Sequence, residues 1–266
     1  MSEPRPAVDD LGAPVALPAR VRRVVSLVPS LTEAVAESGG AGLLAGVTDY
    51  CTHPPGALAG LPRVRGTKNP DVDAVLRVAP DLVLANEEEN RAADLDALRS
   101  AGVPVWVTAP RTVPAAIDSL ARMLAACGLG RPAWLAAAAS AWAEAPAGPG
   151  RRAVVPIWRR PWMVLGRDTF AGDVLARLGV DNAYAGHDER YPKVALDDMR
   201  ARADLVVLPD EPYAFAPERD LDAFAGWGVP VAFVSGRHLT WYGPSLAEAR
   251  GVLSGQLGAA RLPPEP

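Results

Sequence analysis

Hydrophobic residues along the chain fall into two kinds of segment, short apolar runs and longer stretches with helical spacing. The short runs are rich in Val and Leu, are bounded by Gly, Pro or polar residues, and are typical of buried strands. They lie at residues 24–28, 43–47, 81–85, 154–158, 205–208 and 230–234. Segments whose apolar residues recur every three to four positions lie between them. This alternation predicts an α/β fold with parallel sheets.

The longest helical pattern occupies residues 111–145 and is rich in alanine. Its apolar positions keep helical spacing on both sides of a break at residues 128–132, where two glycines precede a proline. The positions are Val113, Ile117, Leu120, Leu124, Trp134, Ala138 and Trp142. We predict one long helix, interrupted or kinked once, that joins two bodies of the protein.

The segments that flank this helix repeat one plan. Residues 69–107 and residues 191–234 each hold a helix begun at a proline, a buried strand, acidic residues directly after it, and a Gly-Val-Pro-Val sequence that opens a further strand. We therefore predict two similar α/β lobes with parallel sheets joined by one long backbone helix. The predicted parts are a disordered arm at 1–20, a first lobe at 21–110, the linking helix at 111–148 and a second lobe at 149–266.

Two helix starts in the first lobe have recognisable capping patterns. Ser30 and Glu33 have the spacing of a capping box, in which each side chain satisfies a free amide at the start of a helix. Asn69 is predicted to cap the next helix, with Pro70 at its first position. The first helix directly follows a strand, so its free amides could hold an anion or a polar ligand group.

Composition narrows the classes of function. The 266 residues are 49% hydrophobic and carry a formal net charge of -4, and the pI is near 5.5, so we expect no basic face and no nucleic acid partner. No apolar run approaches the about 18 residues of a membrane span, and the N-terminal residues lack the pattern of an export signal. We therefore expect a cytoplasmic monomer without a membrane span, in which Cys51 and Cys127 are reduced thiols.

Sequence motifs give no sign of catalysis. Two glycine patterns, at 128–133 and 148–153, match the spacing of a dinucleotide-binding fingerprint but lack the strand-turn-helix context that it requires. The chain has no Walker loop and no HExxH, GxSxG or CxxC motif. We therefore predict that the protein is not an enzyme.

Polar and aromatic residues follow several of the predicted strands. Ligands of parallel α/β sheets bind beyond the carboxyl ends of the strands, so these residues are candidates for ligand contact. In the first lobe they are Tyr50, Cys51, His53, Lys68 and Glu87. In the second lobe they are Asp210, Glu211, Trp241 and Tyr242. Two alternatives remain open: the two aromatic residues could pack under their loop, and Cys51 with His53 could touch a soft metal, although two ligands do not make a site.

At these residues the chain resembles the Fe/B12-type substrate-binding proteins of ABC importers, which include cobalamin- and siderophore-binding proteins. The resemblance covers about residues 24–257. It is carried by 24–33 (VVSLVPSLTE), 45–55 (AGVTDYCTHPP), 80–85 (PDLVLA), the linking helix and 191–208. The resemblance implies two α/β lobes joined by a long backbone helix, with the ligand in the cleft between the lobes.

The resemblance also implies which residues meet a ligand and a partner. The family's ligand-contacting positions correspond to Tyr50, Asn86, Tyr191 and His238. Trp158 would add an apolar face, and Arg159, like Lys68, a cation for ligand carboxylates or phosphates. His53 and His238 are the candidate metal ligands. Family members dock on the importer's membrane subunits through one carboxylate on each lobe, and those positions carry Asp73 and Asp197.

The predicted function is that of a solute-binding protein that captures a metal chelate, a corrinoid-like molecule or a related small ligand, with no other cofactor. Thr67 and Asn86 stand where the family's cobalamin binder has stacking tryptophans, so the ligand is left open. One alternative is a cytoplasmic chelatase-like enzyme that uses His53, His238, Glu87 and Glu211. The other is a ligand-sensing regulatory protein that docks a partner through Asp73 and Asp197.

Overall fold

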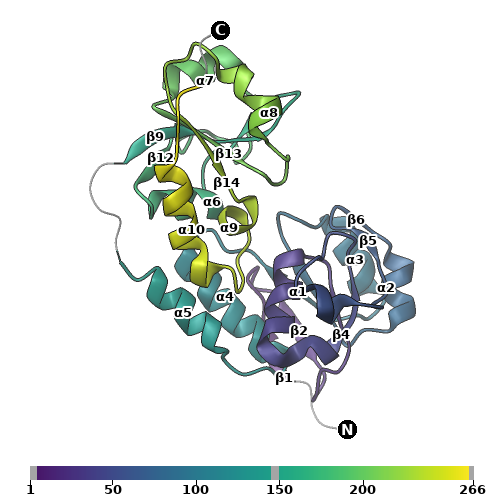
Figure 1. Ribbon diagram of the computed structural model, residues 1–266. Helices are drawn as coiled ribbons and strands as arrows, with labels where there is room; N and C mark the ends of the chain where they lie inside the picture. Colours follow the sequence, from purple (N-terminus) through teal and green to yellow (C-terminus); the bar gives the residue numbers. More distant parts are fainter. Residues whose placement is uncertain (1–4, 145–149, 264–266) are drawn as a thin grey trace. The chain divides into compact units, whose positions relative to one another are not determined.

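The computed structural model describes residues 5–144 and 150–263 and divides into two compact units (Figure 1). The first unit comprises Met1–Pro110, Pro114–Ala137 and Tyr242–Pro244. The second unit comprises Arg111–Val113, Ala138–Trp241 and Ser245–Pro266. Each unit has its own parallel sheet and its own apolar core.

The first unit is built on a four-stranded parallel sheet in the order β4-β3-β7-β8. Its strands are β3 (Val24–Ser26), β4 (Leu44–Val47), β7 (Leu82–Asn86) and β8 (Val105–Thr108). Its helices are α1 (Pro29–Val35), α2 (Val72–Val78) and α3 (Ala92–Ser100), with short helical turns at Ala36–Gly40, Ala41–Leu43 and Pro55–Leu58. A small antiparallel hairpin, β5 (Arg65–Gly66) and β6 (Asn69–Pro70), lies between β4 and α2 in the chain.

The second unit repeats this arrangement with the order β12-β9-β13-β14. Its strands are β9 (Arg151–Val154), β12 (Val180–Asn182), β13 (Leu205–Pro209) and β14 (Val231–Val234), with an antiparallel hairpin of β10 (Pro156–Trp158) and β11 (Met163–Val164). Its helices are α6 (Phe170–Ala176), α7 (Leu196–Arg202), α8 (Pro217–Asp220), α9 (Gly236–Thr240) and α10 (Leu246–Gly258), and a short turn at Leu221–Phe224 follows α8. In both sheets the second strand lies at one edge beside the first, and the third and fourth strands follow on the other side. The predicted fold class, with two similar α/β lobes, is confirmed.

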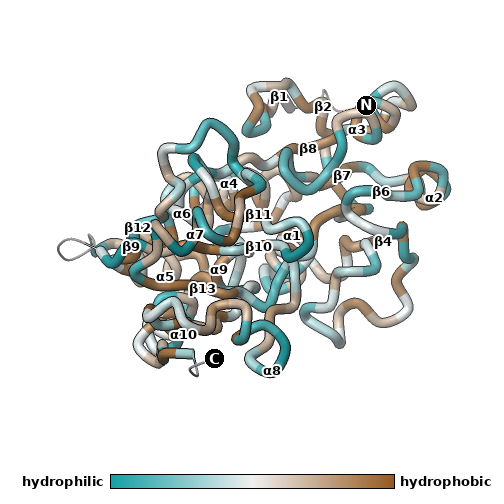
Figure 2. The backbone as a smooth tube through the Cα atoms, turned by 90° about the horizontal axis from the view of Figure 1, so that it is seen from above, coloured by the Kyte–Doolittle hydropathy of each residue, from teal (hydrophilic) through white to brown (hydrophobic). Residues whose placement is uncertain are grey.

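Burial explains why the central strands could be recognised from their sequences. All five residues of β7 and all five of β13 are buried, because these strands have neighbours on both sides and are covered on both faces. Figure 2 shows both strands as hydrophobic over most of their length. Each fully buried Leu or Val stabilises its unit by about 1.5–3 kcal/mol relative to an exposed position.

The helical segment after β8 holds two helices, α4 (Val113–Ala126) and α5 (Ala133–Ala141). The interruption falls at the predicted glycine- and proline-containing break, where Gly128 has a φ of 78°. Only glycine adopts this left-handed conformation without strain. The predicted end of this segment, at residues 145–148, lies outside the described residues.

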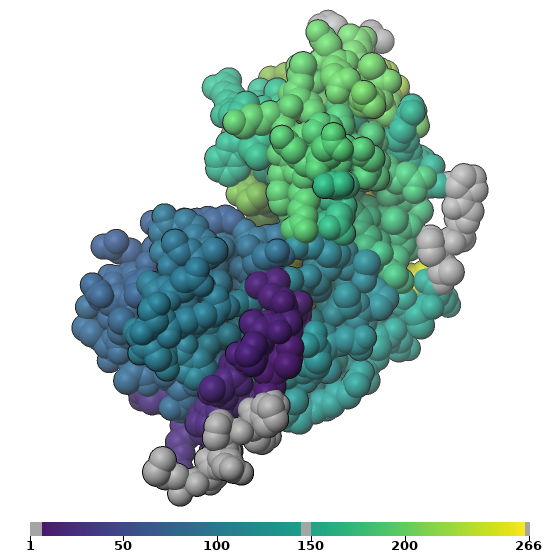
Figure 3. All heavy atoms as spheres, turned by 180° about the vertical axis from the view of Figure 1, so that it is seen from behind, coloured from purple at the N-terminus to yellow at the C-terminus, as the bar shows by residue number. Residues whose placement is uncertain are grey.

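The predicted disordered arm at residues 1–20 is wrong for residues 5–17, which form an antiparallel hairpin of β1 (Arg5–Val8) and β2 (Pro14–Leu17). Asp9 is buried in the turn and accepts hydrogen bonds from the amides of Leu11 and Ala13. The amide of Asp10 donates to Val107 O at 3.1 Å, and the amide of Val107 donates to Asp9 Oδ2 at 3.2 Å. Figure 3 shows this N-terminal segment along the surface of its unit. Its prolines suggested disorder, but these long-range bonds hold it.

Both predicted helix caps are wrong. Helix α1 begins at Pro29, so its N-cap is Val28, which has no side-chain acceptor, and Ser30 lies inside the helix. Asn69 and Pro70 pair in β6 instead of starting a helix. The cap of α2 is Asp71, whose Oδ1 accepts a hydrogen bond from the amide of Ala74 at 2.8 Å.

Candidate functional site

The carboxyl ends of the four parallel strands of the first unit meet at one edge of its sheet. Tyr50 follows β4 there and is 65% exposed. A Cβ on Gly66 would lie 3.2 Å from Tyr50 Cε2, so the Tyr50 ring lies against the β5–β6 hairpin. Lys68, in the turn of that hairpin, donates through Nζ to the carbonyl of Glu88 in the loop after β7. These contacts join three loops into one surface, the first edge cluster (Tyr50, Lys68 and residues 87–88).

Asn86 and Tyr242 were predicted to contact the ligand, but the structure buries both. Asn86 Nδ2 donates to Thr108 O at 2.8 Å and to the hydroxyl of Tyr242 at 2.5 Å. Asn86 Oδ1 accepts hydrogen bonds from the amides of Glu88 and Glu89. Burial raises the pKa of Tyr242 well above its usual value. The two side chains therefore hold the loop after β7 instead of offering a surface to a ligand.

Cys51 was also predicted at the ligand or metal, but it is only 1% exposed. Its Sγ lies 3.1 Å from Thr32 Oγ1 and 3.1 Å from Thr48 Oγ1. Burial raises the pKa of the thiol, and hydrogen bonds from the two threonines offset part of that rise. A protonated, buried thiol is a poor metal ligand, so Cys51 is a core residue.

In the second unit, an exposed tryptophan stands at the carboxyl edge of the sheet. Trp158, which ends β10, is 44% exposed, and its ring meets Tyr213 edge-on at 5.6 Å between centroids. Tyr213 was not among the predicted residues. Its signal in the sequence is its place four residues after the end of β13, in the loop that matches the predicted ligand loop of the first unit.

The acidic residues after β13 hold the loop around α9. Glu211 Oε2 accepts a hydrogen bond from Trp241 Nε1 at 3.0 Å. Asp210 Oδ1 accepts one from the amide of Gly236 at 2.6 Å. The backbones approach so closely that a Cβ on Gly236 would lie 2.5 Å from Glu211 N. We call Trp158, Asp210, Glu211, Tyr213 and Trp241 the second edge cluster.

The two candidate metal ligands lie in different units. His53 Nδ1 is 2.9 Å from Thr52 Oγ1 in the first unit. In the second unit, His238 Nδ1 is 2.8 Å from Ser235 Oγ and its Nε2 is 3.1 Å from Glu248 Oε1. Over residues 5–144 and 150–263, no three or more His, Cys, Asp or Glu side chains gather as a metal site would require. Metal binding by the two histidines stays a prediction.

Arg159 was predicted to pair with a ligand, but its guanidinium is hydrogen-bonded to residues of its own unit. Its Nη1 donates to Asp220 Oδ1 at 2.5 Å and to Arg219 O at 3.0 Å, and its guanidinium lies 5.4 Å from the centre of the Trp162 ring. Asp220 is fully buried, and a buried carboxylate without its cation is strongly destabilising. Arg159 therefore has a structural role.

The remaining predicted residues occupy loops and helix starts. Tyr191 lies partly buried in the segment between β12 and α7. Asp73 and Asp197 are exposed, and each is the second residue of its helix, α2 and α7 respectively. These helices precede the equivalent strands β7 and β13, so the two carboxylates occupy equivalent positions in the two units.

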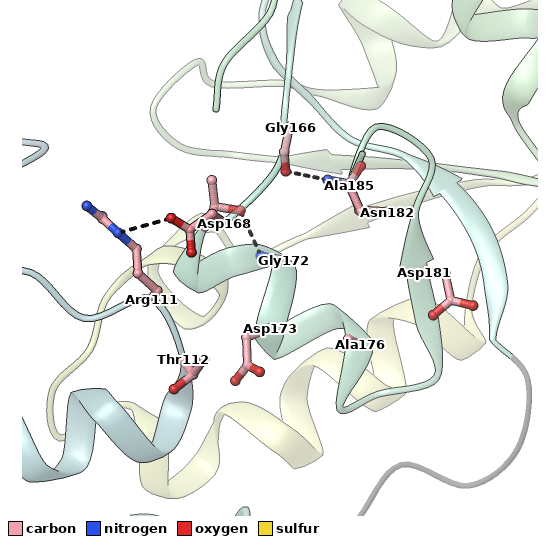
Figure 4. Close-up of a pocket in the computed structure, with 11 residues that line it drawn as sticks. Arg111, Thr112, Gly166, Asp168, Gly172, Asp173, Ala176, Asp181, Asn182 and Ala185 are labelled. Carbon is pink, nitrogen blue, oxygen red and sulfur yellow. Dashed lines mark hydrogen bonds and ion pairs between the residues drawn. The ribbon is translucent and has the colours of Figure 1, made fainter. Parts of the chain in front are cut away.

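The second unit contains two cavities that the sequence did not reveal. One, of about 460 Å³, is lined by residues of α6 and its surroundings (Figure 4). Its polar groups bond to one another: Arg111 pairs with Asp168, Asn182 Nδ2 donates to Gly166 O, and Thr169 caps α6. The other, of about 600 Å³, lies beside α7 and has a different polar lining.

No helix in the described parts of the chain combines the length and the apolar character needed to cross a membrane.

Comparisons with known proteins found a matching family model and similar proteins. The family model described as periplasmic binding protein matches residues 24–129. A vitamin B12-binding protein of Vibrio cholerae serotype O1 is 23% identical over 203 residues, which cover 74% of this chain and 73% of that protein.

Two solved structures share the fold. The periplasmic heme-binding protein RhuT from Roseiflexus sp. RS-1 has a TM-score of 0.73 at 22% identity and covers 89% of this chain and 98% of its own. The periplasmic vitamin B12 binding protein BtuF of Vibrio cholerae has a TM-score of 0.71 at 18% identity, with 90% and 97% covered. At these identities the likeness establishes the fold alone.

The predicted cytoplasmic location is wrong. The matching family and both solved structures are periplasmic binding proteins. The prediction had relied on the absence of a pattern in the N-terminal residues, which is weaker than a match over most of the chain. The cytoplasmic chelatase-like alternative loses the location on which it depended.

Proposed function

From its match to the periplasmic binding protein family model over residues 24–129, we propose that this chain is a solute-binding protein for a metal chelate, a corrinoid-like molecule or a related small ligand. The proposal assigns ligand contacts to both units. They are the first edge cluster with His53, and the second edge cluster with Tyr191 and His238. The role is binding and not catalysis.

The exposed aromatic side chains carry this proposal. Among the described residues, Tyr50 and Trp158 are the aromatic side chains with the highest exposure, and each stands at the carboxyl edge of its unit's sheet. A soluble protein gains nothing from leaving large rings in water, so exposed rings at a binding edge favour a ligand role. Tyr213 packs against Trp158 in a T-shaped pair, and Trp158 remains 44% exposed.

The chemistry of the two edge clusters supports the ligand class. Aromatic faces stack on flat, conjugated molecules, and the ammonium group of Lys68 would attract carboxylate or phosphate groups at their margin. Similar proteins include a vitamin B12-binding protein and a periplasmic heme-binding protein. A flat molecule with anionic substituents meets both requirements.

Equilibrium dialysis of the full chain against cyanocobalamin, hemin and a ferric siderophore tests the proposal. We expect saturable binding of at least one probe, and we expect Tyr50→Ala and Trp158→Ala each to weaken it by about tenfold or more, the loss that about 1.4 kcal/mol of contact energy gives. Leu262→Ala removes another exposed apolar side chain and is the matched control. The proposal fails if no probe binds, or if both aromatic variants keep the affinity of the unaltered chain.

We also propose that the membrane subunits of an ABC importer are the protein partner, docked through Asp73 and Asp197. Both carboxylates are exposed and occupy equivalent positions in α2 and α7. A partner that binds one carboxylate on each unit would require such positions. The double variant Asp73→Asn with Asp197→Asn should keep its ligand affinity and lose co-purification with those subunits. Retained co-purification would contradict this docking.

A further inference from the structure

The cavity beside α7 is the larger of the two described above, about 600 Å³, and small-molecule sites typically measure roughly 300–1,000 Å³. It lies within the second unit, and no member of the second edge cluster lines it. Its chemistry comes from five side chains supplied by α7 and by the segment that follows β12. They are Tyr184, His187, Lys193, Asp198 and Arg202.

The acceptors of this cavity are already used. The hydroxyl of Tyr184 donates to Asp198 Oδ2 at 2.7 Å, and Arg202 Nε donates to Asp198 Oδ1 at 3.1 Å. These two bonds hold the pKa of Asp198 below its usual value, so the carboxylate stays ionised and paired. The Arg202 guanidinium also lies 5.3 Å from the centre of the Tyr184 ring, which is itself buried. Arg202 is therefore fixed from two directions.

The donors, in contrast, are in excess. Within residues 5–144 and 150–263, the Lys193 ammonium makes no hydrogen bond or ion pair, and Arg202 engages only its Nε. His187 Nδ1 accepts the amide of Glu189 at 3.0 Å, so the hydrogen of the neutral ring is on Nε2. The lining holds two permanent cations, Lys193 and Arg202, and one carboxylate, Asp198, so one positive charge of the lining has no carboxylate in it to balance it.

We propose that this cavity binds a small organic oxyanion, a molecule that carries carboxylate or phosphate groups. Lys193, the Nη groups of Arg202 and His187 Nε2 supply the donors, which is the arrangement that charge-assisted recognition of an oxyanion needs. Tyr184 and Asp198 act as positioning residues, because they orient Arg202. The cavity of Figure 4 does not share this property, since its arginine is paired with Asp168.

Isothermal titration of the full chain at low ionic strength tests the proposal, with citrate and inorganic phosphate as separate probes. We expect saturable binding of at least one of them. Lys193→Gln and Arg202→Gln should each weaken it by about tenfold or more, and the double variant should remove it. A preference for citrate over phosphate would identify the carboxylate form of the ligand, and the reverse would identify the phosphate form.

Arg77→Gln is the matched control. Arg77 is exposed in the last turn of α2, the helix of the first unit equivalent to α7, and the variant removes the same charge. It should leave the affinity unchanged. Equal weakening by Arg77→Gln and Arg202→Gln would show that only the overall charge matters, and would overturn the proposal, as would the absence of saturable binding by both probes.

Two further measurements keep the test decisive. Lys193 is exposed, so Lys193→Gln should keep the fold, which circular dichroism verifies. An unchanged affinity of this variant for citrate and phosphate would refute the site. Cyanocobalamin, hemin and siderophore binding should be unaffected by Lys193→Gln and Arg202→Gln. The oxyanion site and the proposed solute site can therefore fail independently.

Discussion

At the scale of single residues, hydrogen bonds between residues far apart in the chain decide which predicted side chains remain available. Asn86 is bound to a tyrosine 156 positions away, and Arg159 to a carboxylate 61 positions away. Asn86 was predicted as a ligand contact from the family resemblance, and Arg159 from its charge, and neither signal reveals a partner so far away in the chain. Tyr50 and Trp158 have no such long-range polar partner in the described structure and are exposed.

The hydroxyl of Tyr242 should contribute measurably to stability. Tyr242→Phe removes the partner of Asn86 Nδ2 and a contact of 3.0 Å with Thr108 Oγ1, and should lower the free energy of unfolding by about 1–2 kcal/mol. Urea denaturation measures it. Tyr50→Phe, at an exposed ring, is the control and should change little. Equal losses in the two variants would contradict the buried network.

The two thiols should be unreactive in the folded protein. Burial raises the pKa of Cys127 to about 12 and also raises that of Cys51, whereas an unperturbed thiol has a pKa near about 8.5. A thiol-specific disulfide reagent at about pH 8 should label neither cysteine in the native state and both in denaturant.

The same shifts fix the sign of the pH dependence. A pKa that is higher in the folded than in the unfolded state favours folding fully below the unfolded value, and this stabilisation is lost as pH rises toward the folded value. The free energy of unfolding should therefore fall as pH rises above about 8.5. Cys127→Ala should show a smaller fall over that range. An identical fall in both proteins would contradict the assignment to Cys127.

At the scale of elements, the strands that coincide with apolar runs could be predicted, and elements without such a run could not. All six apolar runs contain strands of the structure. Burial on both faces explains the continuous hydrophobic sequence of the central strands β7 and β13. Strand β12 has three residues and helix α9 has five, too few for a periodic pattern. The sequence of β12, Val-Asp-Asn after a glycine, holds a single apolar residue and so has no strand pattern of its own. Its strand conformation depends on pairing with β9.

Two glycines of the second unit should respond oppositely to the same substitution. Gly236→Ala would drive a Cβ to within 2.6 Å of Glu211 Cβ, and overpacking of this kind costs about 1–3 kcal/mol. Gly255→Ala in α10 meets no atom within 4 Å and should stabilise the helix by up to about 1 kcal/mol. Thermal denaturation of the two variants compares them. Similar changes in melting temperature would mean that the close approach at Gly236 is absent.

At the scale of the whole molecule, the repeated plan could be predicted because two distant segments have matching patterns. The strand order is the same in the two units, and the resemblance to a known family agreed with it. The cavity beside α7 could not be predicted, because its five polar side chains span residues 184–202 without a motif. The charge and hydrogen-bonding capacity of this cavity depend on which side-chain donors remain unpaired in the folded protein.

The proposed solute should stabilise the chain by mass action. A probe present at about 100 times its dissociation constant adds about 2.7 kcal/mol to the free energy of unfolding. The melting temperature should therefore rise with cyanocobalamin, hemin or the siderophore, whichever binds in dialysis. Trp158→Ala should show a smaller rise at the same probe concentration. A probe that binds without shifting the melting temperature would have to bind the unfolded chain equally well.

The N-terminal hairpin has a consequence for solubility. Strand β8 is the last strand of its sheet, and an uncovered last strand offers its amides and carbonyls to strands of other molecules. Asp9 and Asp10 occupy both outward-facing backbone groups of Val107. A chain shortened to begin at Val21 should therefore aggregate, as light scattering would show. The hairpin of residues 5–17 therefore prevents this sheet from growing by pairing with strands of other molecules.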